Sequence, residues 1–321
     1  MRTSIMNLIS PHWFKDINTS SILIVGYRMM GVGLKDFTQS QPTVDLGDVR
    51  AIFNYGTLSY MDASNVLEFG TDHVRSVNKA KFASKETNIG GWTILITPYI
   101  CDGVQRTEQE TKDSISVAEG LLSALNSINL VYEKTFENIV ELSPIKTSAS
   151  APIFLTSYQF PNLHLSALQL LSLSSVNLRA LHEDVRNRVR LSLRWYSKSV
   201  KEQLTAEGID SFVSIWIAIE VIGMPNTDVR PVVESLARLY QVDYPTARDR
   251  FQLGRIHGFR SEIVHKGKMF PIHSLLNAYV EAIYVDLLAE ILHLPHERRA
   301  EKVLNEKDFD LRKFIYQSFG R

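Results

Sequence analysis

The sequence predicts an α+β protein in which a mixed α/β module, residues 1–162, precedes an all-α helical bundle, residues 163–321. Two observations support this division. Short runs of β-branched and aromatic residues, bounded by Gly, Pro, Asp or Ser, dominate the first half and are typical of strands. Beyond residue 163 the apolar residues recur at intervals of three and four, which is the periodicity of helices. A length of 321 residues is also sufficient for two domains.

The first half is expected to be built mainly from strands. The segment 114–128 places apolar side chains at helical spacing, and Asp113 or Ser114 is available to cap such a helix. The segment 129–142 is ambiguous, and we favour a strand there. The apolar runs that predict the other strands lie at 21–27, 49–55 and 92–100.

The second half predicts an antiparallel bundle of five helices. Asp228 is placed to cap the third helix, Pro245 suits a first helical turn, and Gly267 suits a helix end. Pro295 closes the last helix. The expected helices span 183–204, 209–223, 229–241 and 273–293, and a segment from 245 to 254 leads into the stretch 254–267.

The composition, with 45% hydrophobic and 22% charged residues, is that of an ordinary globular protein. The single cysteine, Cys101, excludes an internal disulfide and a multi-cysteine zinc site, and it suits a reducing cytosol. Residues 1–14 lack the apolar core and cleavage site of a signal peptide. The longest apolar run, 212–224, carries Glu220 and is too short to span a bilayer, so we expect a buried helix. We therefore predict a soluble, cytoplasmic protein with no membrane segment.

Two patterns that could bind a cofactor or a metal are incomplete. Gly26, Gly31 and Gly33 follow a predicted strand, but the dinucleotide fingerprint needs a third glycine where the chain has Asp36. A P-loop would need Lys and then Ser or Thr directly after the second glycine of its spacing, and neither is present. We interpret this segment as a glycine-rich turn. The histidines on either side of Pro295 have no third ligand nearby in sequence, so no metal site and no cofactor are predicted.

Charge is distributed unevenly although the chain is neutral overall. Residues 1–178 hold 13 Lys and Arg against 16 Asp and Glu, whereas residues 179–321 hold 22 against 19. The segment 248–268 carries six Lys and Arg against two Asp and Glu, a net charge of +4. Such a run is either a solvated helix face or a local site for a polyanion, because neutralising phosphates requires clustered cations.

Within this basic segment, Arg260 and His265 lie five positions apart in the stretch GFRSEIVHKG. Arg is permanently cationic, and His exchanges a proton near neutral pH. On a straight helix their side chains would point about 140° apart. We expect them to approach because His265 lies at the helix end, where Lys266 and Gly267 unwind the chain. The negative end of the helix dipole favours a protonated His there, and such a pair suits a phosphodiester.

The segment around this pair resembles the HEPN superfamily, whose endoribonucleases carry Arg, four to six residues and then His near the end of the third main helix of a bundle. Arg260-Ser-Glu-Ile-Val-His265 matches with four intervening residues, and the IVHKG ending is similar to the Apea-like branch. LRWYSKSV, residues 193–200, and FVSIWIAIEVIG, residues 212–223, resemble the first and second helices of that branch. The resemblance covers about residues 180–295 and does not extend to the N-terminal half.

This resemblance implies an endoribonuclease that cuts RNA without a metal, since the 2′-OH of the substrate is the nucleophile. His265 would be the general acid or base, and Arg260 would hold the non-bridging phosphate oxygens. It also implies a homodimer in which both motifs meet in a composite active site. Proteins of this kind serve in bacteria as toxins or in antiviral defence against phage.

Four further residues are candidates for supporting roles. Glu220 is the lone carboxylate of an apolar helix, and it either orients Arg260 or Arg255 or faces water at the helix end. Arg255, His257 and Lys266 are candidate RNA contacts, or solvated charges. Some relatives carry a Tyr two positions after the His as a site of AMP attachment. This chain has glycine there, which argues against that regulation.

Two alternatives to the ribonuclease remain open. The first is a non-catalytic HEPN module that binds nucleotide or RNA or scaffolds a partner. The second, an N-terminal enzyme with the bundle as dimeriser, lacks support because no catalytic constellation is visible in that half. In the favoured interpretation residues 1–162 are a sensor or regulatory domain that binds a trigger ligand or protein and restrains the active site.

Overall fold

The computed structural model describes the chain in thirteen stretches. They are residues 2–4, 19–28, 37–38, 43–60, 90–101, 104–125, 133–141, 153–161, 165–204, 208–224, 226, 228–268 and 271–318.

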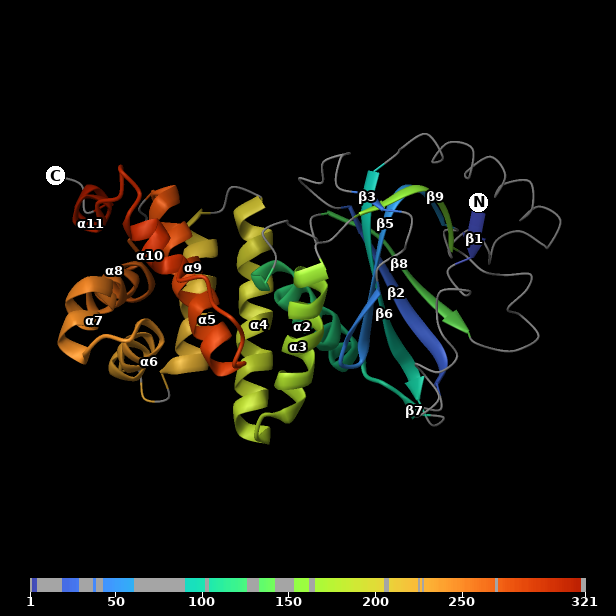
Figure 1. Ribbon diagram of the computed structural model, residues 1–321, viewed down its shortest axis with the longest axis horizontal. Helices are drawn as coiled ribbons and strands as arrows, with labels where there is room; N and C mark the ends of the chain where they lie inside the picture. Colours follow the sequence, from blue (N-terminus) through green and yellow to red (C-terminus); the bar gives the residue numbers. More distant parts are fainter. Residues whose placement is uncertain are drawn as a thin grey trace. The chain divides into compact units, whose positions relative to one another are not determined.

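The chain divides into two compact units. Unit 1 comprises Met1–Ala118 and Asn126–Ser172, and unit 2 comprises Glu119–Leu125 and Leu173–Arg321. An antiparallel sheet occupies unit 1 and helices occupy unit 2, which confirms the α+β fold class (Figure 1). The limits of the units differ from a single cut after residue 162, because the end of one early helix belongs to unit 2.

The sheet of unit 1 runs in the order β1-β9-β5-β6-β2-β8. Three short strands lie off this path: β3 pairs with β9, β4 with β5 and β7 with β6. Adjacent strands pair in antiparallel fashion. The three apolar runs expected to be strands form β2, β5 and β6. Residues 133–141 of the ambiguous segment 129–142 form β8, as favoured, and the rest of that segment lies outside the described residues. The strands are β1 (Arg2–Ser4), β2 (Thr19–Arg28), β3 (Phe37–Thr38), β4 (Thr43–Leu46), β5 (Val49–Tyr60), β6 (Gly90–Cys101), β7 (Val104–Gln105), β8 (Glu133–Glu141) and β9 (Ile153–Pro161).

Long stretches of the central strands are buried, which explains their continuous apolar runs. Every residue from 21 to 27 in β2 and from 93 to 98 in β6 is buried. A strand covered on one face only would alternate apolar and polar residues. Gly26 lies inside β2, paired with Ile94, so the glycine-rich turn predicted for this segment is wrong at that position. Gly31 and Gly33 lie outside the described residues.

Helix α2 (Glu108–Leu125) begins six residues before the predicted start. Thr107 and Glu110 form a capping box: the Thr107 hydroxyl accepts from the Glu110 N–H at 3.1 Å, and the Glu110 carboxylate accepts from the Thr107 N–H at 2.8 Å. The predicted caps, Asp113 and Ser114, therefore lie inside the helix. The apolar pattern missed the start because the first turns are polar and exposed.

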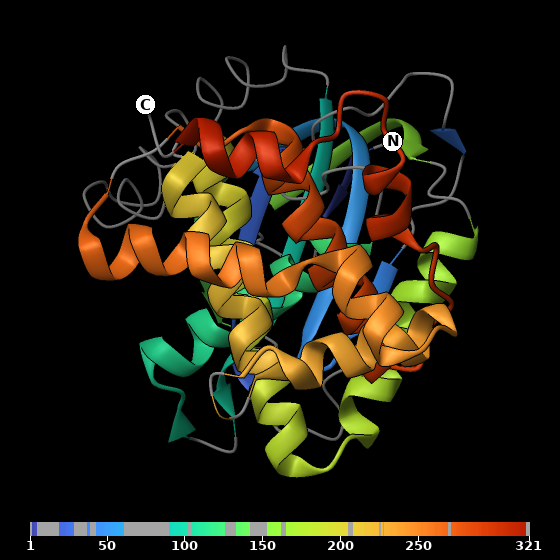
Figure 2. The same cartoon turned by 90° about the vertical axis from the view of Figure 1, so that its left-hand side faces the viewer.

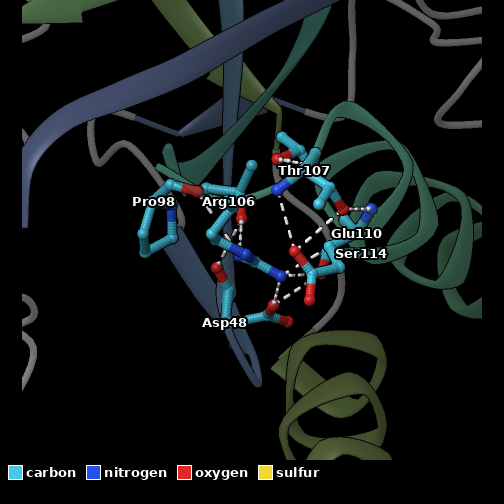
Figure 3. A network of polar contacts seen from close by, with 8 residues as sticks. Asp48, Pro98, Arg106, Thr107, Glu110 and Ser114 are labelled. Atoms are coloured by element: carbon cyan, nitrogen blue, oxygen red, sulfur yellow. Dashed lines mark hydrogen bonds and ion pairs between the residues drawn. The ribbon is translucent and has the colours of Figure 1, made fainter. Parts of the chain in front are cut away.

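A polar network attaches the start of α2 to the turn between β4 and β5 (Figure 3). The Arg106 guanidinium donates to the Asp48 carboxylate at 2.9 Å and to the Ser114 hydroxyl at 2.8 Å. Ser114 in turn donates to the same Asp48 oxygen at 2.5 Å. Gly47, with a φ of +80°, supplies the left-handed conformation of the turn. Arg106, Ser114 and Asp48 thus supply hydrogen-bond partners for one another, so we interpret this network as structural.

The bundle of unit 2 contains the expected helices and three others. Among the described residues the additions are α3, whose first half belongs to unit 1, and the short helices α10 and α11. Figure 2 shows this part of the chain, coloured from yellow-green to red. The helices are α3 (Leu165–Ala180), α4 (Glu183–Leu204), α5 (Gly208–Gly223), α6 (Arg230–Tyr240), α7 (Tyr244–Phe251), α8 (Leu253–Lys266), α9 (Ser274–Ile291), α10 (Arg299–Leu304) and α11 (Leu311–Ser318).

Most of the residues predicted to lie at the beginning or end of a helix do so in the structure. Pro245 lies in the first turn of α7, and Gly267, with a φ of +63°, caps the end of α8. The Asp228 carboxylate accepts the Arg230 N–H at 2.9 Å at the start of α6. The break between α7 and α8 lies at Gln252, which has a φ of +50°, and not at Gly254 as expected.

The core of the bundle centres on α5, whose apolar run is buried as predicted. Phe212, Ile215, Trp216 and Ile219 are each at most 1% exposed. The Phe212 ring meets the Phe259 ring of α8 edge to face, with centroids 5.5 Å apart. This contact fixes α8 against α5, which sets the position of the candidate site. No helix within the described residues combines the length and apolarity needed to cross a bilayer.

Candidate functional site

Helix α8 presents one face to the core and the other to solvent. Its buried residues recur at three- and four-residue steps, as expected for an amphipathic helix. Arg260 lies at the edge of the buried face, and His265 lies on the exposed face in the last turn. The buried residues are Leu253, Ile256, Phe259 and Ile263.

Arg260 is held by a carboxylate from the neighbouring helix. Its Nη2 donates to Glu220 Oε2 of α5 at 3.1 Å, and the two side chains are only 14% and 21% exposed. The other oxygen of Glu220 accepts from the Trp216 indole N–H at 2.9 Å. Of the two alternatives for Glu220, the structure shows the one in which this carboxylate orients Arg260. The Nε–H of the same guanidinium is buried without a hydrogen-bond partner among the described residues.

The side chains of Arg260 and His265 approach each other. Arg260 Nη1 lies 3.5 Å from His265 Nε2, at the outer limit of a hydrogen bond. The expected cause, unwinding of the helix at Lys266 and Gly267, is wrong, because α8 remains helical through Lys266. The approach instead reflects the reach of the long Arg side chain across the helix surface.

The other three residues predicted to contact RNA differ in their surroundings. His257 is half-buried against the Trp216 ring at 5.9 Å, and its Nδ1 has no hydrogen-bond partner in the described part of the chain. It therefore lies on the side of α8 that faces α5. Arg255 is exposed. Lys266 forms an ion pair with Glu262, so its charge is already compensated.

Glu262 is the local acid of this basic segment. It accepts from Lys266 and, at 2.7 Å, from Lys268. The hydrogen bonds from Lys266 and Lys268 lower the pKa of the Glu262 carboxyl below its usual value. Lys266 and Lys268 thus share a single carboxylate, which the net charge of +4 already includes. Arg250 and Arg260 pair with Glu301 and Glu220, two acids outside this segment. The positive charge left for a ligand is smaller than the sequence count suggested.

Sequence reasoning missed one member of the site, Trp216. It lies four positions before Glu220 on α5, which is the spacing that places two side chains on one helix face. That spacing was available in the sequence, but Trp216 was assigned only to the apolar run. The resulting chain of contacts runs from Trp216 through Glu220 and Arg260 to His265.

This arrangement can bind an anion next to a titratable imidazole. Glu220 occupies one edge of the guanidinium, so the Nη1 edge beside His265 is the one left for a ligand oxygen. His265 is exposed, so its imidazole is accessible to a ligand from solvent. No cluster of three metal-ligating side chains occurs among the described residues.

Comparison of the chain with protein-family models, with curated protein sequences and with solved structures gave no match. The resemblance to HEPN proteins therefore stays a prediction. It depends on the Arg260-x4-His265 spacing and on the sequence around it.

Proposed function

We propose that the chain is a metal-independent endoribonuclease of the HEPN type. The observation that supports this most is the contact between Arg260 and His265, with the Arg anchored by Glu220. An anchored guanidinium has lost much of its freedom before substrate binds, so it can stabilise charge that develops on a phosphate at little further entropic cost. An imidazole within 3.5 Å of it is placed to move the protons of the same reaction.

The proposed reaction needs only groups of the substrate and these two side chains. A base removes the proton of the 2′-OH, whose oxygen attacks the adjacent phosphorus. The bond from phosphorus to the 5′-oxygen breaks, and an acid protonates that leaving oxygen. The products are a 2′,3′-cyclic phosphate and a 5′-OH. Arg260 stabilises the phosphorane, and His265 serves as the acid or the base.

Two proton transfers are simplest with two imidazoles, and a second chain would supply the other one. The exposed face of α8 suits such a contact. Gly254 and Gly258 are exposed there, and a Cβ at either position would meet no atom within 4 Å. Val264, 43% exposed, adds apolar surface nearby. We propose a homodimer across this face, with a composite active site.

The wider biological role is proposed from the resemblance alone. A ribonuclease of this kind acts in the cytoplasm, as a toxin or in antiviral defence. It must be restrained until needed, and unit 1 would be the part that senses a trigger ligand or protein. The small opposite net charges of the two halves allow electrostatic attraction but do not specify it.

A non-catalytic module is the second candidate, and one observation favours it. Arg260 is mostly buried and already paired with Glu220, as a purely structural Arg would be. In that case the Nη1 edge and His265 would bind the phosphate of a nucleotide or an RNA without cutting it.

Incubation of the purified protein with total RNA in excess EDTA distinguishes the two candidates. We expect cleavage that leaves 2′,3′-cyclic phosphate and 5′-OH ends, identified by sequencing of the cleavage sites. His265→Ala should abolish it with the fold intact, because this side chain is exposed. Arg312→Ala is the control, since it removes an exposed cation from another helix of the same unit, α11. Dependence on a divalent ion, 5′-phosphate ends or an active His265→Ala protein would contradict the proposal.

A further inference from the structure

Helix α4 carries an uninterrupted run of positive charge. Between residues 186 and 201 it has six Lys and Arg and no Asp or Glu. The density of net positive charge in this run exceeds that of the 248–268 segment, where two acids accompany six cations. The cations are Arg186, Arg188, Arg190, Arg194, Lys198 and Lys201.

Part of this run faces outward, because the opposite side of α4 is buried in the core. The buried residues follow the helical steps of four, three and four. On the other side Arg188, Leu191 and Lys198 are exposed, and Arg190 and Trp195 are partly exposed. We name these five residues the outer face of α4. The buried residues are Val189, Leu193, Tyr196 and Val200.

Two of these cations are not compensated within the described part of the chain. Lys198 lies 3.4 Å from Glu202, and the neighbouring Lys201 donates to the buried Glu119 at 2.6 Å. Arg188 and Arg190, by contrast, form no hydrogen bond or ion pair with another described residue through their side chains. Arg188 and Arg190 point about 160° away from each other on the helix and flank the outer face on its two sides. Cations without counter-charges leave a positive potential there, which a bound polyanion would neutralise.

The outer face also offers an aromatic ring and an exposed apolar side chain. Lys198 Nζ lies 4.9 Å from the centre of the Trp195 ring, and Leu191 is 41% exposed. Arg190 and Lys198 lie two helical steps of four apart, a rise of about 6 Å per step. Cations that follow a sugar-phosphate backbone, next to an aromatic ring on which a base can stack, are typical of surfaces that bind single-stranded nucleic acid.

We infer that the outer face of α4 binds single-stranded RNA, at a surface separate from the Arg260 and His265 pair. The identity of the polyanion as RNA rests on the proposed function. A membrane surface fits less well, because insertion requires the apolar side of a helix and that side of α4 lies in the core. A duplex fits less well too, since its bases are stacked on one another and leave none for Trp195.

The test measures binding of a labelled single-stranded RNA of 20 nucleotides to the full chain by fluorescence anisotropy. His265→Ala is used as the background so that the RNA stays intact. Arg188→Gln combined with Arg190→Gln should weaken binding about tenfold at 0.15 M salt. It should also lower the slope of log Kd against log salt by about 1.4, since each phosphate contact with a single strand contributes about 0.7. Trp195→Ala should weaken binding at least about fivefold.

Arg312→Gln combined with Lys313→Gln is the matched control, because it removes two exposed cations from α11 in the same unit. It should leave both the affinity and the salt slope unchanged. Equal losses in the two double variants, or no loss in either, would overturn the inference. So would tighter binding to vesicles of phosphatidylserine, or to a DNA duplex, than to the RNA.

Failure of this inference and failure of the proposed function give different results. RNA that binds at the outer face but is never cut by the protein with His265 intact contradicts only the ribonuclease. RNA that is cut, with an affinity unaffected by the Arg188 and Arg190 changes, contradicts only the role of α4.

Discussion

Glu220 is the residue on which the geometry of the candidate site depends. Its two oxygens accept from Trp216 and from Arg260, so it determines where the guanidinium lies. Without Glu220, the charge of the largely buried Arg260 would have no counter-charge, which is unfavourable. We therefore regard Glu220 as a positioning residue for Arg260.

Glu220→Gln should preserve the shape of this contact and remove its charge. A hydrogen bond to a charged group contributes about 1.5–3 kcal/mol, so kcat/KM should fall about tenfold to a hundredfold. RNA cleavage rates measured with the variant check this. Glu220→Asp keeps the charge and should restore part of the rate, which a merely structural defect would not show. Wild-type kcat/KM in a folded Glu220→Gln protein would refute the positioning role.

At the scale of elements, the end of α2 is part of the helical unit. Glu119, 2% exposed, accepts from Ser197 and Lys201 of α4, and Arg299 donates to the Ala124 carbonyl at 3.4 Å. Gly120 lies beside α4, where a Cβ would meet the Leu193 carbonyl oxygen at 2.4 Å. A helix that precedes two strands in sequence thus completes the core of unit 2.

Gly120→Ala should destabilise the protein by about 1–3 kcal/mol, because the clash is with backbone that cannot rotate away. The midpoint of urea unfolding should fall accordingly. Gly208→Ala is the control: its Cβ would meet the Ile272 side chain at an ordinary 3.8 Å, so little change is expected. Equal stability of the Gly120→Ala and wild-type proteins would show that the two helices are not packed this closely.

At the scale of the whole molecule, the proposed dimer determines how many chains contribute to one site. Arg260 and His265 contact each other within one chain. The composite site would therefore combine two intact Arg260 and His265 pairs, one from each chain. It would not be built from the Arg260 of one chain and the His265 of the other.

Mixing Arg260→Ala protein with His265→Ala protein tests this arrangement. We expect the mixed dimers to stay inactive, because each contains only one residue of each pair. Mass photometry of the wild-type protein supplies the oligomeric state. Recovery of cleavage on mixing would mean that one Arg and one His from different chains suffice, and a fully active monomer would exclude the shared site.

The sequence by itself determined the helices and strands that carry a strong local pattern. The buried strands β2, β5 and β6 and the helices α4 to α9 lie close to their predicted positions, since apolar periodicity, prolines and Gly267 act locally. The predicted start of α2 is wrong because its first turns are polar. Helices α10 and α11 have 6 and 8 residues, which is too short for apolar spacing to predict a helix.

Only the tertiary structure decided which of these residues meet. The partner of Glu220 could have been Arg255 or Arg260, and the packing of α5 against α8 selects Arg260. The same packing adds Trp216 to the site and places His257 against the Trp216 ring. Contacts between helices depend on how whole faces pack, and sequence spacing specifies only which side chains share a face.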